Sequence, residues 1–149
     1  MKWLDLPPVW LLAFAVLAYW QAHFFTLGLS LAHPLTMLLG GLLVGGGIVL
    51  ILLAAMEFRR HKTTIIPHQE ASSLIQTGVF KRSRNPIYLA DVLILTGLIL
   101  RWDAILSLPL VPILFWVLET RFVIPEENRL RRHFRADFAR YAQKTRRWI

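Results

Sequence analysis

Four stretches of this chain contain few charged residues and are long enough to form apolar helices. They cover residues 9–31, 34–58, 87–100 and 104–123. A helix needs about 20 mostly apolar residues to cross the roughly 30 Å hydrocarbon core of a bilayer. With 56% hydrophobic and 17% charged residues, the composition is also far from that of a soluble domain. The pattern predicts an all-α, polytopic membrane protein with four transmembrane helices.

The chain is predicted to form one membrane domain, residues 1–149. Residues 1–62 supply the first two spans, and residues 63–149 supply a polar loop, the last two spans and a tail. The first apolar run is too long for a signal peptide and no cleavage site follows it, so we expect it to remain as a span. Only residues 101–103 separate the third and fourth runs, which predicts a tight helical hairpin.

Glycines cluster inside the second apolar run, at positions 40–41 and 45–47. In lipid, small residues at this spacing let helix backbones approach each other, and Gly41-x-x-x-Gly45 has the familiar packing pattern. A phosphate-binding loop would need a preceding strand and a following Lys and Ser or Thr, and the sequence has neither. Close helix packing is therefore the interpretation we favour.

The formal net charge is +8. In a soluble chain this balance would suggest nucleic acid, but the apolar content favours a bilayer with anionic lipids and no nucleic acid as the partner. In a four-span arrangement nearly all basic residues fall on one side, and only Arg101 lies opposite. The positive-inside rule then places both termini in the cytoplasm, and we expect an integral protein of a prokaryotic inner membrane.

The chain has no cysteine, which excludes disulfides, thiolate metal sites and cysteine nucleophiles. No metal site is predicted from other residues. Any covalent chemistry must therefore come from a cofactor or substrate.

The tail begins with Pro125-Glu126-Glu127, which is typical of a helix start because proline suits the first turn and carboxylates suit the positive end of the helix dipole. An apolar stripe follows at helical spacing, made of Leu130, Phe134, Phe138 and Tyr141. This pattern predicts an amphipathic C-terminal helix on the cytoplasmic surface. The simplest role of the glutamate pair is capping and charge balance.

The run from Ser72 to Tyr88 is the part that membrane anchoring explains least. It combines a glycine, an aromatic residue, a basic cluster and an Asn-Pro-x-Tyr step, and we expect Asn85 to cap a helix that starts at Pro86. Each feature also has a simpler explanation: the basic cluster as a lipid-binding flank, Gly78 as a turn, and Tyr88 as an interfacial aromatic. The run shares its side of the membrane with the tail, so the two can form one site.

Several motifs in this half of the chain occur in a fixed order. They are Leu74-Ile75-x-Thr77-Gly78-Val79-Phe80, Ser83-Arg84-Asn85-Pro86-x-Tyr88, Glu126-Glu127-x-x-Leu130, Phe134-x-x-x-Phe138-x-x-Tyr141 and Arg147-Trp148-Ile149. Together they resemble the isoprenylcysteine carboxyl methyltransferase and phospholipid methyltransferase superfamily. The resemblance covers about the second half of the chain.

The resemblance implies a membrane methyltransferase that uses S-adenosylmethionine in a pocket on the cytoplasmic side. The acceptor would be lipophilic, such as an isoprenylcysteine-like carboxylate or a phospholipid amine. Arg121 would orient the acceptor, and Glu127 would accept a proton from an amine. The expected cofactor-binding residues are Ser72, Ser73, Leu74, Ile75, Gly78, Phe80, Arg84, Asn85, Pro86, Tyr88 and Glu126.

The sequence departs from the common family pattern, which has His at the position of Asn85 and Gly at that of Ala90. Asn85 can still form hydrogen bonds but cannot titrate. Asp91, inside the third run, is a functional candidate because intramembrane carboxylates are costly. The interpretation we favour pairs it with a basic residue near the interface, and Glu119 has the same two readings.

The acceptor stays open among carboxylate, amine and thiol. Two other classes of protein also stay open. One is a small non-catalytic adaptor that binds anionic lipid, and the other is a relative of nicotinamide-dependent sterol reductases.

Overall fold

The computed structural model describes residues 6–28, 30, 32–61 and 74–148. Within them every regular element is helical, apart from one isolated bridge between Ser83 and Arg146. The elements are α1 (Pro7–Phe24), α2 (Pro34–Arg60), the 3₁₀ turn η2 (Gly78–Lys81), α3 (Pro86–Arg101), the 3₁₀ turn η3 (Ile105–Ser107), α4 (Leu110–Leu118), the π-helix η4 (Glu119–Val123), α5 (Ile124–Phe134) and α6 (Ala136–Lys144). The prediction of an all-α chain is confirmed.

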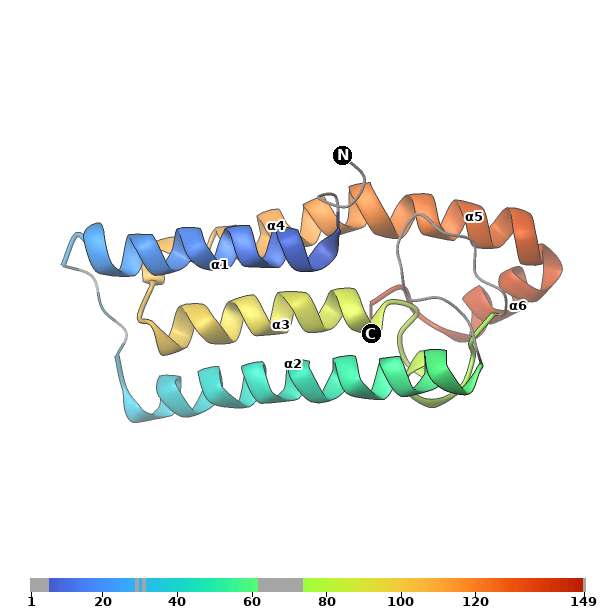
Figure 1. Ribbon diagram of the computed structural model, residues 1–149, viewed down its shortest axis with the longest axis horizontal. Helices are drawn as coiled ribbons and strands as arrows, with labels where there is room; N and C mark the ends of the chain where they lie inside the picture. The colour runs from blue at the N-terminus through green and yellow to red at the C-terminus, as the bar shows by residue number, and fades with distance from the viewer. Residues whose placement is uncertain (1–5, 29, 31, 62–73, 149) are drawn as a thin grey trace.

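Helix α3 is the centre of the bundle (Figure 1). It packs against α2 on one side and against α1 and α4 on the other. The start of α1, the end of α2, the start of α3 and the helices α5 and α6 all lie at one end of the bundle, whereas η3 lies at the other end (Figure 1). The polar end of the molecule is therefore built from segments that are far apart in the sequence.

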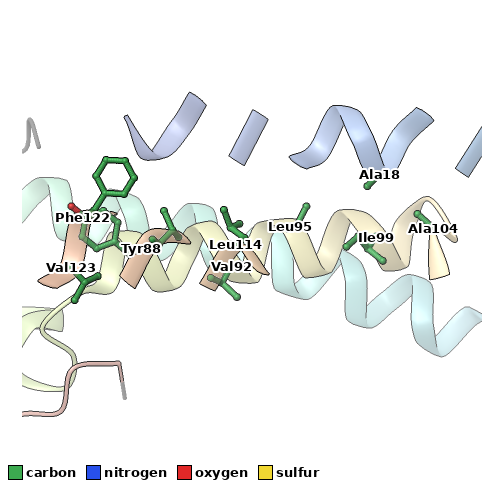
Figure 2. Packing of buried hydrophobic residues seen from close by; sticks show 10 residues of the cluster. Ala18, Tyr88, Val92, Leu95, Ile99, Ala104, Leu114, Phe122 and Val123 are labelled. Atoms are coloured by element: carbon green, nitrogen blue, oxygen red, sulfur yellow. The ribbon is translucent and has the colours of Figure 1, made fainter. Parts of the chain in front are cut away.

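The main core follows one face of α3 (Figure 2). Val92, Leu95 and Ile99 recur at spacings of three and four, which brings them onto one side of the helix. They pack with Tyr88 of α3 itself, with Ala104 just before η3, and with buried residues of the neighbouring helices: Ala18, Leu114, Leu118, Phe122 and Val123. Because α3 is surrounded by other helices, it positions the residues at its start rigidly.

Glycines bring α2 and α3 into close contact. A Cβ atom added to Gly97 would lie 2.5 Å from the carbonyl oxygen of Gly40, and one added to Gly47 would lie 2.6 Å from Ile94. Gly45, by contrast, has nothing within 4 Å of an added Cβ. Close packing through glycine is thus confirmed, but the predicted Gly41–Gly45 pair was wrong, because Gly40 and Gly47, two turns apart, face α3.

In the part of the chain that the structure describes, two helices are long and apolar enough to cross a bilayer, judged by length and composition: α2 and the continuous helix Ile105–Phe134. Helices α1 and α3 have 18 and 16 residues, so they span only about 27 and 24 Å at 1.5 Å per residue. The first helix is shorter than its apolar run, which was expected to continue to residue 31, since α1 ends at Phe24. The count of four spans therefore remains a proposal.

The tail differs from the predicted single helix. Pro125 does not start a new helix, because α4, η4 and α5 continue from the fourth apolar run through it. Proline lacks an N–H group, and the wider π-helical turn just before it is a known way to accommodate an interrupted hydrogen-bond ladder. At Arg135 the backbone adopts a φ of 47°, and the chain turns back into α6. The predicted apolar stripe is thus divided between two short helices.

Candidate functional site

A cavity of about 350 Å³ lies at the polar end of the bundle. This is within the range of about 300 to 1,000 Å³ that is typical of small-molecule sites. It is lined by Leu6, Pro7, Pro8, Ile51, Ala55, Phe58, Phe80, Arg84, Asn85, Pro86, Ile87, Tyr88, Asp91 and Glu126. The start of α1, the end of α2, the start of α3 and the start of α5 all contribute to its mostly apolar wall.

A smaller cavity of about 50 Å³ adjoins the first and shares Phe58, Phe80, Arg84, Asn85 and Glu126 with it. Its remaining walls are Leu74, Ile75, Glu127, Leu130, Phe138 and Tyr141. The hinge segment, residues 74–85, and the tail helices therefore meet around one continuous site, as the shared side of the membrane predicted.

A hydrogen bond joins the start of α3 directly to the start of α5. The phenol Oη of Tyr88 donates to Glu126 Oε2 at 2.7 Å. Both residues line the larger cavity. The carboxylate of Glu126 is thus fixed at the cavity wall by a residue 38 positions earlier in the chain.

Glu127, the next residue, is held by two arginines. Arg147 approaches with Nη2 2.7 Å from Glu127 Oε2, and Arg84 lies 3.4 Å from Oε1. The bond to Glu127 raises the pKa of the Arg147 guanidinium above its ordinary value, so this group stays charged. Arg147 also reaches Glu119 at 3.0 Å, so Glu119 does pair with a basic residue. Any proton transfer by Glu127 has to proceed in the presence of these two cations.

Arg84 ties the hinge segment to the end of the chain. Its Nη1 donates to the carbonyl oxygens of Ala142 at 3.1 Å and Thr145 at 2.8 Å. The same side chain lies against Glu127. Most of its donors are thus used by protein acceptors, and its predicted role toward the cofactor carboxylate stays a prediction.

The C-terminal segment lies alongside the hinge segment. The backbone N–H of Arg84 donates to the carbonyl oxygen of Arg146 at 3.0 Å, and Asn85 Nδ2 donates to that of Arg147 at 2.9 Å. Asn85 occupies the N-cap position of α3, but its side chain makes no capping bond. The predicted cap is therefore wrong in detail: the position is correct, but the amide holds the C-terminal segment.

Gly78 is required by the backbone of the hinge segment. Its φ of +61° is in the left-handed region, and an added Cβ would lie 2.6 Å from Glu57 Oε1. The same glutamate accepts a hydrogen bond from Thr77 Oγ1 at 2.5 Å. Gly78 thus shapes the turn that leads to the cavity but does not line either cavity.

Tyr141 of α6 holds Phe80 in place, because the Tyr141 hydroxyl donates to the carbonyl oxygen of Phe80 at 2.7 Å. Burial raises the pKa of the Tyr141 phenol above its ordinary value, although the nearby Arg84 opposes the shift. Tyr141 therefore remains a hydrogen-bond donor at neutral pH. The ring of Phe80 also packs edge to face on Phe58 of α2.

The structure brings most of the predicted site residues together. Those that line the two cavities are Leu74, Ile75, Phe80, Arg84, Asn85, Pro86, Tyr88, Glu126 and Glu127. Arg121 lines neither cavity, and its guanidinium lies over the ring of Trp10, 5.2 Å from the centroid. Ser72 and Ser73 lie outside the described residues.

Asp91 is a cavity residue whose surroundings differ from the expected ones. It is 2% exposed, and its Oδ2 has no hydrogen-bond partner in the part of the chain that the structure describes. Among the residues that the structure describes, the expected pairing with a basic residue is not observed, because the start of α3 is buried between other helices.

Sequence reasoning also missed the contribution of the first half of the chain to the site. Ile51, Ala55 and Phe58 of α2 line the larger cavity together with the start of α1. Their spacing of four and three residues brings them onto one face of α2, which is the only sequence signal that points to them.

The fold and site define a helical protein whose mostly apolar cavity carries carboxylate, guanidinium and aromatic side chains at one end of the bundle. A family model described as phospholipid methyltransferase matches residues 35–137. The match covers more than half of the chain and begins in α2, so it extends beyond the half that carried the motifs. The chain belongs to the phospholipid methyltransferase family. Searches of curated proteins and of solved structures find no match.

Proposed function

We propose that the protein is an integral membrane methyltransferase that transfers a methyl group from S-adenosylmethionine to a lipophilic acceptor at the cytoplasmic interface. Family membership supports methyl transfer and a lipid-type acceptor. The observation that carries the proposal is the contact of Tyr88 with Glu126, because it joins the two motif regions at the wall of the larger cavity.

The side chains around the two cavities fit the chemistry of S-adenosylmethionine. This molecule carries two cationic centres, a carboxylate and an aromatic base, and when bound it supplies an activated methyl group. Carboxylates and aromatic faces stabilise such cations, so Glu126, Phe80 and Tyr88 would hold them. Leu74, Ile75 and Asn85 would hold the remaining polar and aromatic parts.

The protein's own contribution is positioning and exclusion of water. An activated methyl group needs little acid–base help, so the rate depends on holding the acceptor in line and away from solvent. The wall formed by Pro7, Ile51 and Ala55 is apolar and suits a lipophilic acceptor. The sequence-based proposals that Arg121 orients the acceptor and that Glu127 accepts a proton have less support, because Arg121 lines neither cavity and Glu127 lines only the smaller one.

We further propose four spans with both termini in the cytoplasm. The outward faces of α1, α2 and α4 support this, because large apolar side chains are exposed on each of them: Leu12, Val16 and Trp20 on α1, Leu38, Leu42, Val49, Leu52 and Met56 on α2, and Ile113 and Trp116 on α4. Soluble monomers rarely expose apolar surface of this extent. Basic residues gather at the end of the bundle that carries α5 and α6, which favours a cytoplasmic location for that end.

The absence of cysteine from the chain allows a direct topology test. A Ser30→Cys variant should react with a membrane-impermeant maleimide in intact bacterial spheroplasts, whereas Lys144→Cys should react only after permeabilisation. Ser30 lies between α1 and α2, and Lys144 ends α6. Labelling of both positions from the same side would contradict the four-span proposal.

The function is tested by binding of S-adenosylmethionine to purified protein in detergent, measured by isothermal titration. Glu126→Gln removes a charge but keeps the shape that Tyr88 contacts, so we expect affinity to fall about tenfold or more. The matched control is Asp137→Asn, since Asp137 is exposed on α6 and pairs with Arg140 there. Equal affinity of the Glu126 variant and wild type would contradict the proposed site, and a non-catalytic adaptor would show no binding at all.

A further inference from the structure

Among the polar residues that line the larger cavity, Asp91 is the one to which neither the family resemblance nor the cofactor assigns a role. It lies three residues beyond Tyr88 on α3, which places it about 4.5 Å deeper along the helix axis. Its side chain lines the larger cavity and is almost completely buried, with Oδ2 unpartnered within the described residues. The polar group is therefore available to a molecule inside the cavity.

A carboxyl group in this position is costly to keep. A buried polar atom without a hydrogen-bond partner destabilises a protein, and ionisable groups inside a bilayer are rare for the same reason. Packing does not explain it, because a leucine or asparagine side chain of similar size would fill the same space. A ligand that supplies a hydrogen-bond donor or a positive charge would satisfy Asp91.

The two acidic residues of the larger cavity have different surroundings. Glu126 already accepts the hydroxyl of Tyr88 and also lines the smaller cavity, next to Leu74 and Ile75, which are proposed to hold the cofactor. Asp91 does not reach the smaller cavity and shares its own with the apolar residues Pro7, Ile51 and Ala55. The group that meets Asp91 is therefore the polar end of an otherwise apolar molecule.

We propose that Asp91 is the acceptor-binding residue: its carboxylate receives the ammonium group of a lipid amine and takes one proton from it. This inference rests on the proposed function. One N–H bond of the ammonium breaks, its electron pair stays on nitrogen, and the proton moves to Asp91 Oδ2. The resulting neutral amine has the lone pair that methylation requires. A carboxylate acceptor would instead bring another negative charge into a cavity that already holds two acidic residues.

The first test compares Asp91→Asn with the matched control Asp103→Asn, in the turn that follows the far end of α3. Asp91→Asn should bind S-adenosylmethionine with wild-type affinity in isothermal titration. Its transfer of labelled methyl to phosphatidylethanolamine vesicles should fall about tenfold or more. The fall should appear as a higher KM for the vesicle lipid. Asp103→Asn should match wild type. Wild-type KM and rate in the Asp91 variant would overturn the inference.

A second measurement uses the wild-type protein and does not depend on activity. Dicyclohexylcarbodiimide modifies carboxyl groups in apolar surroundings, and peptide mass analysis locates the product. Dodecylamine should protect Asp91 from modification, whereas lauric acid at the same concentration should not. Equal protection by both, or by neither, would overturn the inference.

The two proposals can fail separately. Absence of S-adenosylmethionine binding in wild type would refute the proposed function, yet selective protection by dodecylamine would still identify an amine site at Asp91. Conversely, tight cofactor binding together with full activity of Asp91→Asn would refute only the role of Asp91.

Discussion

A Glu127→Gln variant is expected to lose about 3 kcal/mol of folding stability, because it leaves two arginines facing a neutral side chain. The side chains of Glu127 and Arg84 are 7% and 15% exposed, so both charges are largely removed from water. Breaking a buried pair costs about 3–5 kcal/mol. We expect the lower end of this range, since the side chain of Arg147 is 37% exposed and solvent screens part of its charge.

Unfolding of the purified variants in detergent, followed by circular dichroism, measures this loss. The control is Asp137→Asn, which removes one partner of the exposed Asp137–Arg140 pair on α6. Exposed pairs contribute less than about 1 kcal/mol, so the control should stay close to wild type. If the Glu127 variant were no less stable than the control, the positive charges of Arg84 and Arg147 would not depend on Glu127 for neutralisation.

The same variant should also loosen the site. Arg147 and Arg84 connect Glu127 to the C-terminal segment and the hinge segment, and Asn85 bonds to the backbone of Arg147. Loss of the central carboxylate removes the group that both guanidiniums share. Hydrogen exchange in the hinge segment should therefore increase in Glu127→Gln but not in Asp137→Asn.

Local chemistry explains why parts of the fold could be predicted. The start of α3 follows from Asn85 and Pro86, because proline fixes φ and fits the first turn of a helix. The apolar runs predicted the main helices because each run lies within a single continuous segment of the sequence. The meeting of hinge and tail also followed from sequence, because it needed only the prediction that both lie on one side of the membrane.

Other features depend on contacts that sequence patterns do not encode. The continuous helix through Pro125 requires the π-helical turn of residues 119–123, and proline alone favours a helix start there. The turn at Arg135 needs a left-handed backbone that arginine rarely adopts, so the stripe from Leu130 to Tyr141 read as one helix. In the folded chain both helices pack against residues of the hinge segment, a contact that no local sequence pattern encodes.

The candidate site shows the same division. Glu126 and Tyr88 belong to motifs and were found in the sequence, whereas Arg147 was not assigned a role and the α2 wall was missed. Arg147 is 20 residues from Glu127 and meets it only because the chain folds back after Phe134. Asp91 was recognised as unusual, but whether its Oδ2 finds a hydrogen-bond partner among the described residues depends on how the helices pack around the start of α3.

Gly97→Ala is expected to destabilise the protein by about 3 kcal/mol, near the upper end for added volume in a packed interior. The new methyl group would lie 2.5 Å from the carbonyl oxygen of Gly40 and 2.9 Å from the backbone nitrogen of Val44. Both are main-chain atoms in the middle of α2, so no side-chain rotation relieves the overlap. The helices α2 and α3 must move apart.

The matched control is Gly45→Ala, in the same contact region of α2 but facing away from α3. An added Cβ there meets nothing within 4 Å. The change should therefore leave the protein's stability unchanged or raise it by up to about 1 kcal/mol, because alanine loses less backbone entropy on folding than glycine does. Unfolding in detergent compares the two variants, and equal stabilities would show that α2 and α3 do not pack as closely as described.

Because α2 carries Ile51, Ala55 and Phe58 to the larger cavity, its displacement in Gly97→Ala should also weaken binding of S-adenosylmethionine, whereas Gly45→Ala should not. A loss of both stability and binding in one glycine variant, at a position outside the cavity, would tie the shape of the site to the contact between these two helices.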